Sequence, residues 1–193
     1  GCAAGYFLSV MAEDDWDISG LEPSDAIRVR AEAELGKENV SGGLLGMDDF
    51  EPRSFDLVTF WDVIEHIPDP RAALVRAGEL LAPGGLLIIE TQDVSSRAAK
   101  VLGKKWQHYK HAEHIYHFNP ATLTALLDSA GFDSLENSGR LGGKYVTFAF
   151  VAERVGRIHP FLSFLASPLR LLGQKALYIN LFDEMIVVAK PRT

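Results

Sequence analysis

The segment from Phe55 to Asp93 constrains the fold most, because it places two apolar runs on either side of one helix-like stretch. The run Leu86–Ile89 is continuously apolar and Phe55–Phe60 is mostly apolar, as strands buried on both faces are. Between them, residues 69–81 repeat apolar side chains at helical spacing, and a Pro-Gly-Gly sequence at 83–85 ends that pattern. A strand, a helix and a strand in this order predict a parallel sheet with right-handed crossovers, and therefore an α/β fold.

The rest of the chain continues this alternation within a single expected domain, residues 1–193. Further strands are expected at Trp16–Glu22, Val40–Gly43, Phe132–Asn137 and Asp183–Ala189, and further helices after the first glycines, at Pro23–Leu35, at Ser95–Gly103 and at Pro120–Ala130. Pro23 is expected in the first turn of its helix, where its missing N–H costs nothing. Residues 142–175 predict a helical insertion between the last two strands.

Charge and cysteine content narrow the classes of protein. The formal net charge is −7, whereas nucleic-acid binders normally carry a basic field, so we expect no nucleic-acid partner. Cys2 is the only cysteine, so no intrachain disulfide can form, and no signal peptide opens the sequence; we expect a cytoplasmic protein. The apolar stretch Phe161–Leu172 is interrupted by Pro168 and Arg170, and it is shorter than the roughly 20 residues of a transmembrane helix.

A small-residue loop and a later acid predict a nucleotide site. Gly1, Ala3 and Gly5 keep the spacing of a G-x-G-x-G loop, with alanine at the middle position. A loop of this kind before a helix points backbone N–H groups at a ligand. Glu22 lies 17 residues after Gly5, at the end of the next expected strand, where a carboxylate can accept hydrogen bonds from ribose hydroxyls. Nicotinamide cofactors and S-adenosylmethionine both use this pair of features.

The sequence WDVIEHIPDP at 61–70, followed by LLAPGG at 80–85 and an apolar strand, resembles the class I S-adenosylmethionine-dependent methyltransferases. Within them it is most similar to the small-molecule branch that includes the ubiquinone-biosynthesis O-methyltransferases. The resemblance implies a Rossmann-like sandwich, mostly parallel with an antiparallel last strand. It also implies S-adenosylmethionine as cofactor and a small-molecule acceptor methylated at oxygen. A nicotinamide-dependent oxidoreductase is less favoured, because it has no role for these two segments. A non-catalytic binding module stays open.

The resemblance also assigns the cofactor site. It implies contacts from the loop, the acid, a leucine pair and the end of a strand: Gly1, Cys2, Ala3, Gly5, Glu22, Pro23, Leu44, Leu45, Trp61 and Asp62. In the family, the loop begins with an acid two residues before the position of Gly1, at the end of the central first strand. Neither that acid nor that strand is in this sequence, so we expect an N-terminal truncation that removes the first strand.

Histidines supply the candidates for catalysis. A hydroxyl acceptor must lose a proton, and histidine suits that task at neutral pH. His66 follows a strand at the expected mouth of the site, and His114 lies in a segment rich in aromatic residues and histidine. We predict these two as catalytic, although either could serve packing alone. Trp106, Tyr109 and His117 are expected to line the substrate pocket.

Histidines at 108, 111, 114 and 117 recur every three residues, a spacing that could collect metal ligands on one face of a helical turn. Aromatic residues are interleaved and no cysteine joins them, so we expect no metal. The insertion carries many large apolar residues. These could pack in the core, cover the acceptor pocket, form a homodimer through the C-terminal helices or rest on a membrane surface.

Overall fold

The computed structural model describes residues 1–46, 50–109, 112–140, 142–158 and 160–192. The strands are β1 Gly20–Leu21, β2 Val40–Ser41, β3 Phe55–Trp61, β4 Leu81–Gln92, β5 Phe132–Ser138, β6 Lys144–Thr147, β7 Ala176–Ile179 and β8 Glu184–Pro191. The α-helices are α1 Tyr6–Glu13, α2 Asp25–Leu35, α3 Pro70–Leu80, α4 Arg97–Leu102, α5 Pro120–Ser129, α6 Phe148–Ile158 and α7 Pro160–Ala166. Short 3₁₀ turns are η1 Lys37–Asn39, η2 Ile64–His66, η3 Gly103–Lys105 and η4 Ser167–Leu172.

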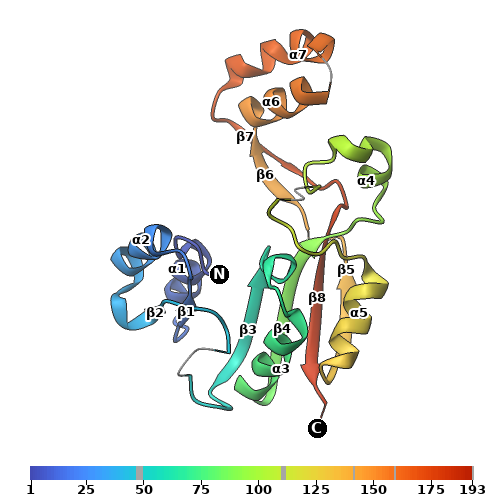
Figure 1. The fold of residues 1–193 in the computed structure, drawn as a ribbon. Coiled ribbons are helices and arrows are strands. Elements are labelled where there is room, and N and C mark those ends of the chain that lie inside the picture. Colours follow the sequence, from blue (N-terminus) through green and yellow to red (C-terminus); the bar gives the residue numbers. More distant parts are fainter. Residues whose placement is uncertain (47–49, 110–111, 141, 159, 193) are drawn as a thin grey trace.

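A four-stranded sheet of order β3-β4-β8-β5 forms the centre of the molecule (Figure 1). β3 runs parallel to β4, and β8 runs antiparallel to both β4 and β5. The predicted α/β fold with an antiparallel last strand is therefore confirmed. Because β3 and β4 point the same way, the residues that follow them, from Asp62 and from Asp93, meet at one edge of the sheet.

Helices α3 and α5 pack on one face of this sheet and enclose the core. Leu74 from α3 and Leu123 from α5 are fully buried against Leu87 and Val187 of the strands. Both helices begin with proline after a capping residue: the Asp69 carboxylate accepts from Ala72 N, and the Asn119 side chain accepts from Thr122 N. Such caps satisfy N–H groups that the first turn leaves without helical partners.

The N-terminal part forms a second, smaller unit beside β3 (Figure 1). β1 and β2 make a separate parallel pair, next to α1 and α2. Cys2 N donates to Leu21 O at 2.8 Å, so the first residues run alongside β1. A Cβ atom on Gly1 would lie 2.8 Å from Val63 Cγ2. The loop therefore lies between β1 and the end of β3.

Three expectations about element bounds differ from the structure. β1 covers only Gly20–Leu21 of the expected Trp16–Glu22, because its partner β2 offers two residues for pairing. Pro23 precedes the N-cap residue Ser24 of α2 and so lies outside the first turn. β4 begins at Leu81 and continues through the Pro-Gly-Gly sequence, which a positive φ of 88° at Gly84 allows.

Residues 142–175 were expected to form a helical insertion between β5 and β8, but the structure places the strand β6 at the start of that range. β6 pairs with β7, just beyond the range, as an antiparallel ladder in which Tyr145 lies opposite Tyr178. The helices α6 and α7 and the turn η4 lie between these strands, beyond the carboxyl ends of β3 and β4 (Figure 1). Among the described residues, no helix combines the length and apolar character needed to cross a membrane.

Candidate active site

The glycine loop forms a tight corner that only small residues can occupy. Gly5 has a φ of 86° and Ala3 a φ of 49°. Gly5 N donates to Cys2 O at 3.0 Å, which closes the turn. A Cβ on Gly5 would lie 2.7 Å from Leu35 Cδ1, so a larger residue would have to displace the Leu35 side chain of α2. The loop thus places its backbone N–H groups at the start of α1, where the N-terminus of a helix favours an anionic ligand.

Glu22 fastens this loop to the end of β1. Its buried carboxylate accepts from Ala3 N at 2.9 Å through Oε2 and from Ser24 N at 2.8 Å through Oε1. An ionised carboxylate has about four lone-pair sites, so each oxygen can accept one more hydrogen bond. Glu22 is therefore both an anchor for the loop and an acceptor for two hydroxyls of a ligand such as a ribose.

Trp61 is the last residue of β3, and Asp62 follows it, opposite the loop. The Trp61 ring packs on Phe7 of α1, with ring centroids 5.1 Å apart. Trp61 Nε1 is buried, and the described residues give it no hydrogen-bond partner. A buried donor normally has an acceptor, so this N–H suits a polar ligand between α1 and β3. Asp62 is exposed and has a φ of 52°.

The other residues expected at the cofactor differ in their setting. Cys2 is half-buried in the loop, whereas Pro23 and Leu44 are exposed. Leu45 packs partly against the main core. The residues that follow them, 47–49, lie outside the described part. The structure thus groups the loop, Glu22 and Trp61, and it places Leu44 at the surface.

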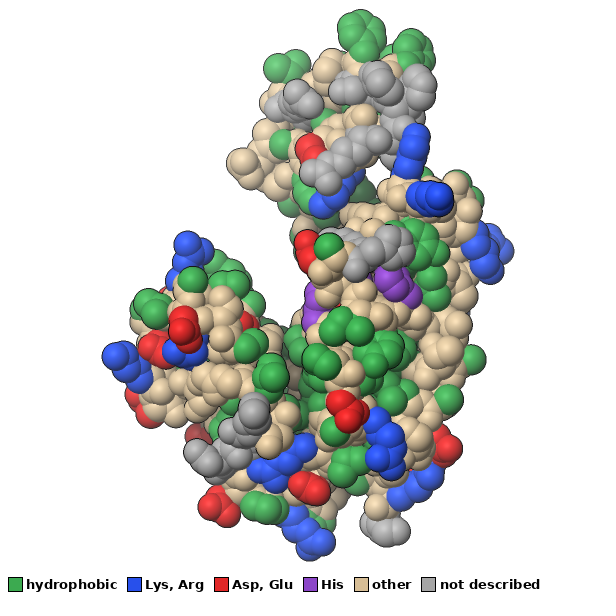
Figure 2. Space-filling model, in the orientation of Figure 1, with side chains coloured by type: hydrophobic (Ala, Val, Ile, Leu, Met, Phe, Trp, Pro, Cys, Tyr) green, Lys and Arg blue, Asp and Glu red, His purple; other side chains and the backbone are tan. Residues whose placement is uncertain are grey.

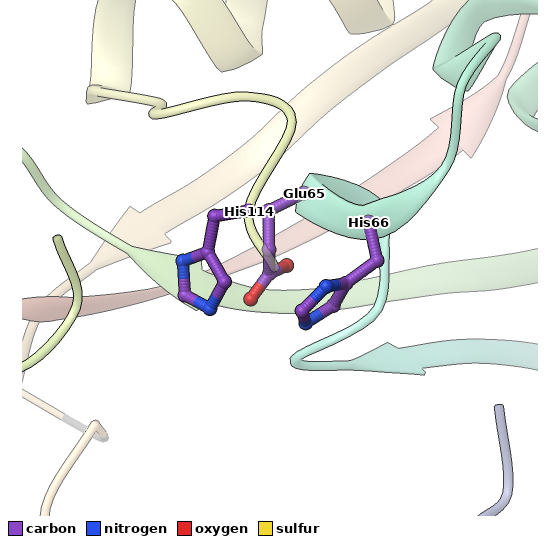
Figure 3. A group of neighbouring side chains, drawn as sticks. All are labelled: Glu65, His66 and His114. Carbon is purple, nitrogen blue, oxygen red and sulfur yellow. The ribbon is translucent and has the colours of Figure 1, made fainter. Parts of the chain in front are cut away.

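The second group of predicted residues gathers around η2. Ile115 N and Tyr116 N both donate to Glu65 O, at 2.9 and 3.1 Å, which ties the histidine-rich segment to this turn. His114 therefore lies beside His66, with ring centroids 4.8 Å apart at 87°. Figure 3 shows the Glu65 carboxylate between the two imidazoles. Sequence alone could not place Glu65 there, because residues 65 and 114 are brought together by contacts between segments that lie far apart in the chain.

The tautomer of His66 follows from its contact with the backbone. His66 Nδ1 lies 2.8 Å from Glu113 O, and a carbonyl can only accept, so Nδ1 carries the proton. Nε2 of the neutral ring then has a free lone pair. His66 is exposed, whereas His114 is buried. His66 can therefore take a proton from a ligand that reaches this edge of the sheet.

Burial raises the pKa of Glu65, and the nearby Asp62 charge adds to that shift. Thr91 Oγ1 lies 2.9 Å from Glu65 Oε2 and 2.8 Å from Gln92 Oε1, and its single proton can serve only one of them at a time. Glu65 Oε1 is buried without a hydrogen-bond partner among the described residues. Glu65, His66 and His114 each offer a ligand atom, all within 4.8 Å of one another. The group can move protons or hold a divalent cation.

The predicted pocket residues form an aromatic stack next to His114. Trp106 is buried and its Nε1 donates to Asp183 Oδ2 at 2.8 Å, so its ring anchors the segment. Tyr109 packs on Trp106 at 5.1 Å and on His117 at 5.4 Å. The His117 and His114 rings are 5.9 Å apart. Tyr109 and His117 are half-buried and reach the site, whereas His111 lies outside the described residues.

A lysine that no sequence motif had indicated lies at the same edge of the sheet, beside two carboxylates. Lys144 Nζ of β6 lies 2.6 Å from Glu184 Oε1 and 3.3 Å from Asp62 Oδ2. Burial raises the pKa of Glu184 to about 7, although Lys144 opposes that shift. Burial also raises the pKa of Glu90. Glu90 belongs to β4, which lies between β3, the strand before Asp62, and β8, the strand of Glu184. No sequence motif signalled Lys144, because its partners lie 82 and 40 positions away.

Histidine side chains reach the surface beside an open notch between the N-terminal unit and the C-terminal helices (Figure 2). Gly1 borders this region through Val63, three residues before His66. The loop that can hold a nucleotide and the histidines that can accept a proton are thus neighbours along the end of β3. Such an arrangement suits group transfer between a bound cofactor and a second ligand.

Comparison with known proteins gives a family match. The family described as a methyltransferase domain matches residues 1–137. A ubiquinone biosynthesis O-methyltransferase from Idiomarina loihiensis is 27% identical over 152 residues, which cover 72% of this chain and 62% of that protein. A similar relative from Thiobacillus denitrificans is 27% identical over 72% of this chain and 65% of its own length. The chain thus spans less than two thirds of these curated relatives.

Solved structures share the fold. A crystal structure of a SAM-dependent methyltransferase from Thermotoga maritima matches 100% of this chain and 80% of its own, with a TM-score of 0.66 and 19% identity. At that identity the match concerns the fold. It bears out the Rossmann-like arrangement inferred above for the sheet and its helices.

Proposed function

This chain belongs to the methyltransferase-domain family, and from that premise we propose that it transfers a methyl group from S-adenosylmethionine to an oxygen atom of a small-molecule acceptor. The bound cofactor would supply a methyl carbon on a positively charged sulfur. The chain's own residues would bind the cofactor, align the acceptor with that carbon and remove the acceptor's proton. Alignment of two bound reactants supplies a large part of the rate in such displacements.

The cofactor would be held by the loop Gly1–Gly5 and by Glu22. The Glu22 carboxylate is fixed by two backbone N–H groups and has acceptor sites left for ribose hydroxyls. The buried Trp61 Nε1 offers a donor at the other wall of the same corner. Asp62 would border the positively charged sulfur, where a carboxylate is favourable.

The observation that carries the catalytic part is the fixed tautomer of His66. Its Nδ1 proton is held by Glu113 O at 2.8 Å, so Nε2 is the atom that can accept a proton from an acceptor hydroxyl. As the methyl carbon–sulfur bond breaks and the new carbon–oxygen bond forms, the sulfur would leave as a neutral thioether. The O–H proton would move to Nε2, which gives a neutral methyl ether and an imidazolium. His114, packed edge-on against His66, is the second candidate for this role.

Oxygen is proposed as the acceptor atom for two reasons. A hydroxyl is a weak nucleophile until a base takes its proton, and a histidine base stands at the site. The curated relatives described above are named ubiquinone biosynthesis O-methyltransferases. Tyr109 and His117 would form one wall of the acceptor pocket, and Trp106 would fix that wall through its bond to Asp183.

The test is transfer of a labelled methyl group to a panel of phenols, catechols and amines, with wild-type chain and two matched variants. His66→Asn keeps a donor for Glu113 O but has no basic Nε2. Glu136→Gln is the control, because Glu136 is an exposed residue of β5. We expect the wild-type chain to methylate hydroxyl compounds, His66→Asn to do so about 10²–10⁴-fold more slowly, and Glu136→Gln to do so at the wild-type rate.

Three results would contradict the proposal. Labelled amines without labelled hydroxyl compounds would show nitrogen as the acceptor atom. Loss of transfer with a chelator, restored by a divalent cation, would show that Glu65, His66 and His114 hold a metal and do not act as bases. A folded chain that binds the cofactor without transfer to any acceptor would favour the non-catalytic module.

A further inference from the structure

The outermost feature of the C-terminal helices is a cluster of exposed apolar side chains. We call it the apolar tip; its members are Phe161, Phe164, Leu165, Leu171 and Leu172. Phe161 is 63% exposed, Phe164 76% and Leu171 90%. Apolar side chains protrude at the far end of α7 in Figure 2, away from the central sheet. Protruding aromatic and leucine side chains on one end of a protein are a typical mark of an interaction surface.

The tip is not an unfinished part of the core. α6 packs against α7 and η4, and the small residues Ala152 and Ala166 are buried on these elements. The inner faces of the helices are thus already covered, while the phenylalanines of the tip stay largely exposed. Substitution of these phenylalanines should leave the helices folded.

In the sequence, the segment that carries the tip has a charge of the opposite sign to that of the chain as a whole. No Asp or Glu occurs between Glu153 and Asp183, whereas Arg154, Arg157, Arg170 and Lys175 fall within that stretch. The chain as a whole has a formal net charge of −7. A negatively charged partner repels the acidic remainder of the chain and attracts this basic segment.

We propose that the apolar tip docks on an anionic lipid surface. Phe and Leu side chains beside Arg and Lys are the composition of segments that lie in the headgroup region of a membrane. α6 has 11 residues and α7 has 7, so they can lie on a bilayer but are too short to span it. Each Lys or Arg side chain near an anionic membrane strengthens binding by about fivefold. Phenylalanine side chains that enter the bilayer add to this by burying apolar surface.

The tip is joined to the active-site edge by β6. Lys144 of that strand contacts Asp62 and Glu184, and α6 follows the strand directly. A docked tip would therefore hold the notch of Figure 2 close to the lipid surface. The docking itself does not depend on the proposed function, since it is read from exposure and charge alone.

Co-sedimentation with vesicles tests the proposal directly. The vesicles are phosphatidylcholine alone, or phosphatidylcholine mixed with phosphatidylglycerol. We expect the chain to bind the mixed vesicles, with binding that weakens as salt is added. Phe161→Ser combined with Phe164→Ser should lower binding by about tenfold or more, since two aromatic side chains no longer enter the headgroup region.

Two further variants separate the contributions. Arg157→Gln combined with Arg170→Gln should reduce binding to the mixed vesicles and its dependence on salt. Val29→Ser removes an apolar residue of α2 that is about as exposed as Phe161, and this variant should bind the mixed vesicles as the wild type does. Circular dichroism of each variant verifies that the helices are retained.

Three outcomes would overturn the proposal. The first is no binding to either kind of vesicle. The second is equal binding by wild type and the phenylalanine variant. The third is a dimer by light scattering that the phenylalanine variant converts to monomer, which would assign the tip to a second copy of the chain.

Discussion

Replacement of Glu22 by glutamine tests whether this one carboxylate holds the glycine loop. The side chain is buried and accepts two backbone N–H groups, from Ala3 at 2.9 Å and from Ser24 at 2.8 Å. Glutamine retains one acceptor oxygen, but its NH₂ group must face the other N–H. A hydrogen bond to a charged group contributes about 1.5–3 kcal/mol, so we expect the free energy of unfolding to fall by about 2 kcal/mol.

For a domain of this size, that loss corresponds to a decrease of about 4–8 °C in the melting temperature. Urea unfolding followed by circular dichroism measures the same loss as a lower midpoint. The matched control is Glu136→Gln, since Glu136 is exposed on β5, and its midpoint should stay at the wild-type value. If Glu22→Gln and Glu136→Gln unfold at the same urea concentration, the carboxylate does not anchor the loop and the reasoning fails.

Three other predictions concern the charged edge and the core. Glu184 has a pKa of about 7 when folded and an ordinary value of 4.5, so the folded state holds the extra proton between these values. The free energy of unfolding of the wild type should fall by up to about 3 kcal/mol relative to that of Glu184→Gln as the pH rises from 4.5 to above 7. Urea titrations in which the two proteins show the same dependence of this free energy on pH would refute this. Lys144→Met should cost about 1 kcal/mol at pH 8, allowing for solvent screening, and less at pH 5, where Glu184 is protonated; an equal cost at both values would contradict the pairing. Leu123→Ala removes a fully buried side chain and should cost about 2–5 kcal/mol of unfolding free energy; a loss below 1 kcal/mol would show that α5 repacks.

Local patterns predicted the central sheet well. The apolar run at 55–60 became β3, and the helical spacing that follows became α3, because both patterns report burial within one short segment. Asn119 and Pro120 marked the start of α5 correctly, since a cap and a first-turn proline act only on their neighbours. The antiparallel direction of β8 agreed with the last strand that the family resemblance implied, whereas its position between β4 and β5 was not predicted.

Features that depend on distant partners could not be predicted in the same way. The strand β6 was expected to be helical, because its pairing with β7 joins residues on either side of two helices. Lys144 carried no motif, and its role is visible only once β6 is placed next to Asp62 and β8. Glu65 was seen as a neighbour of His66 in sequence, but its contact with His114 needs the two backbone bonds to residues 115 and 116.

Calorimetric titration of this chain with S-adenosylhomocysteine, beside a titration with NADH, tests the central claim most directly. The account predicts saturable one-to-one binding of S-adenosylhomocysteine, weakened in Glu22→Gln and unchanged in Glu136→Gln, with no binding of NADH. A folded chain that binds NADH, or that binds S-adenosylhomocysteine equally well without the Glu22 carboxylate, would contradict it.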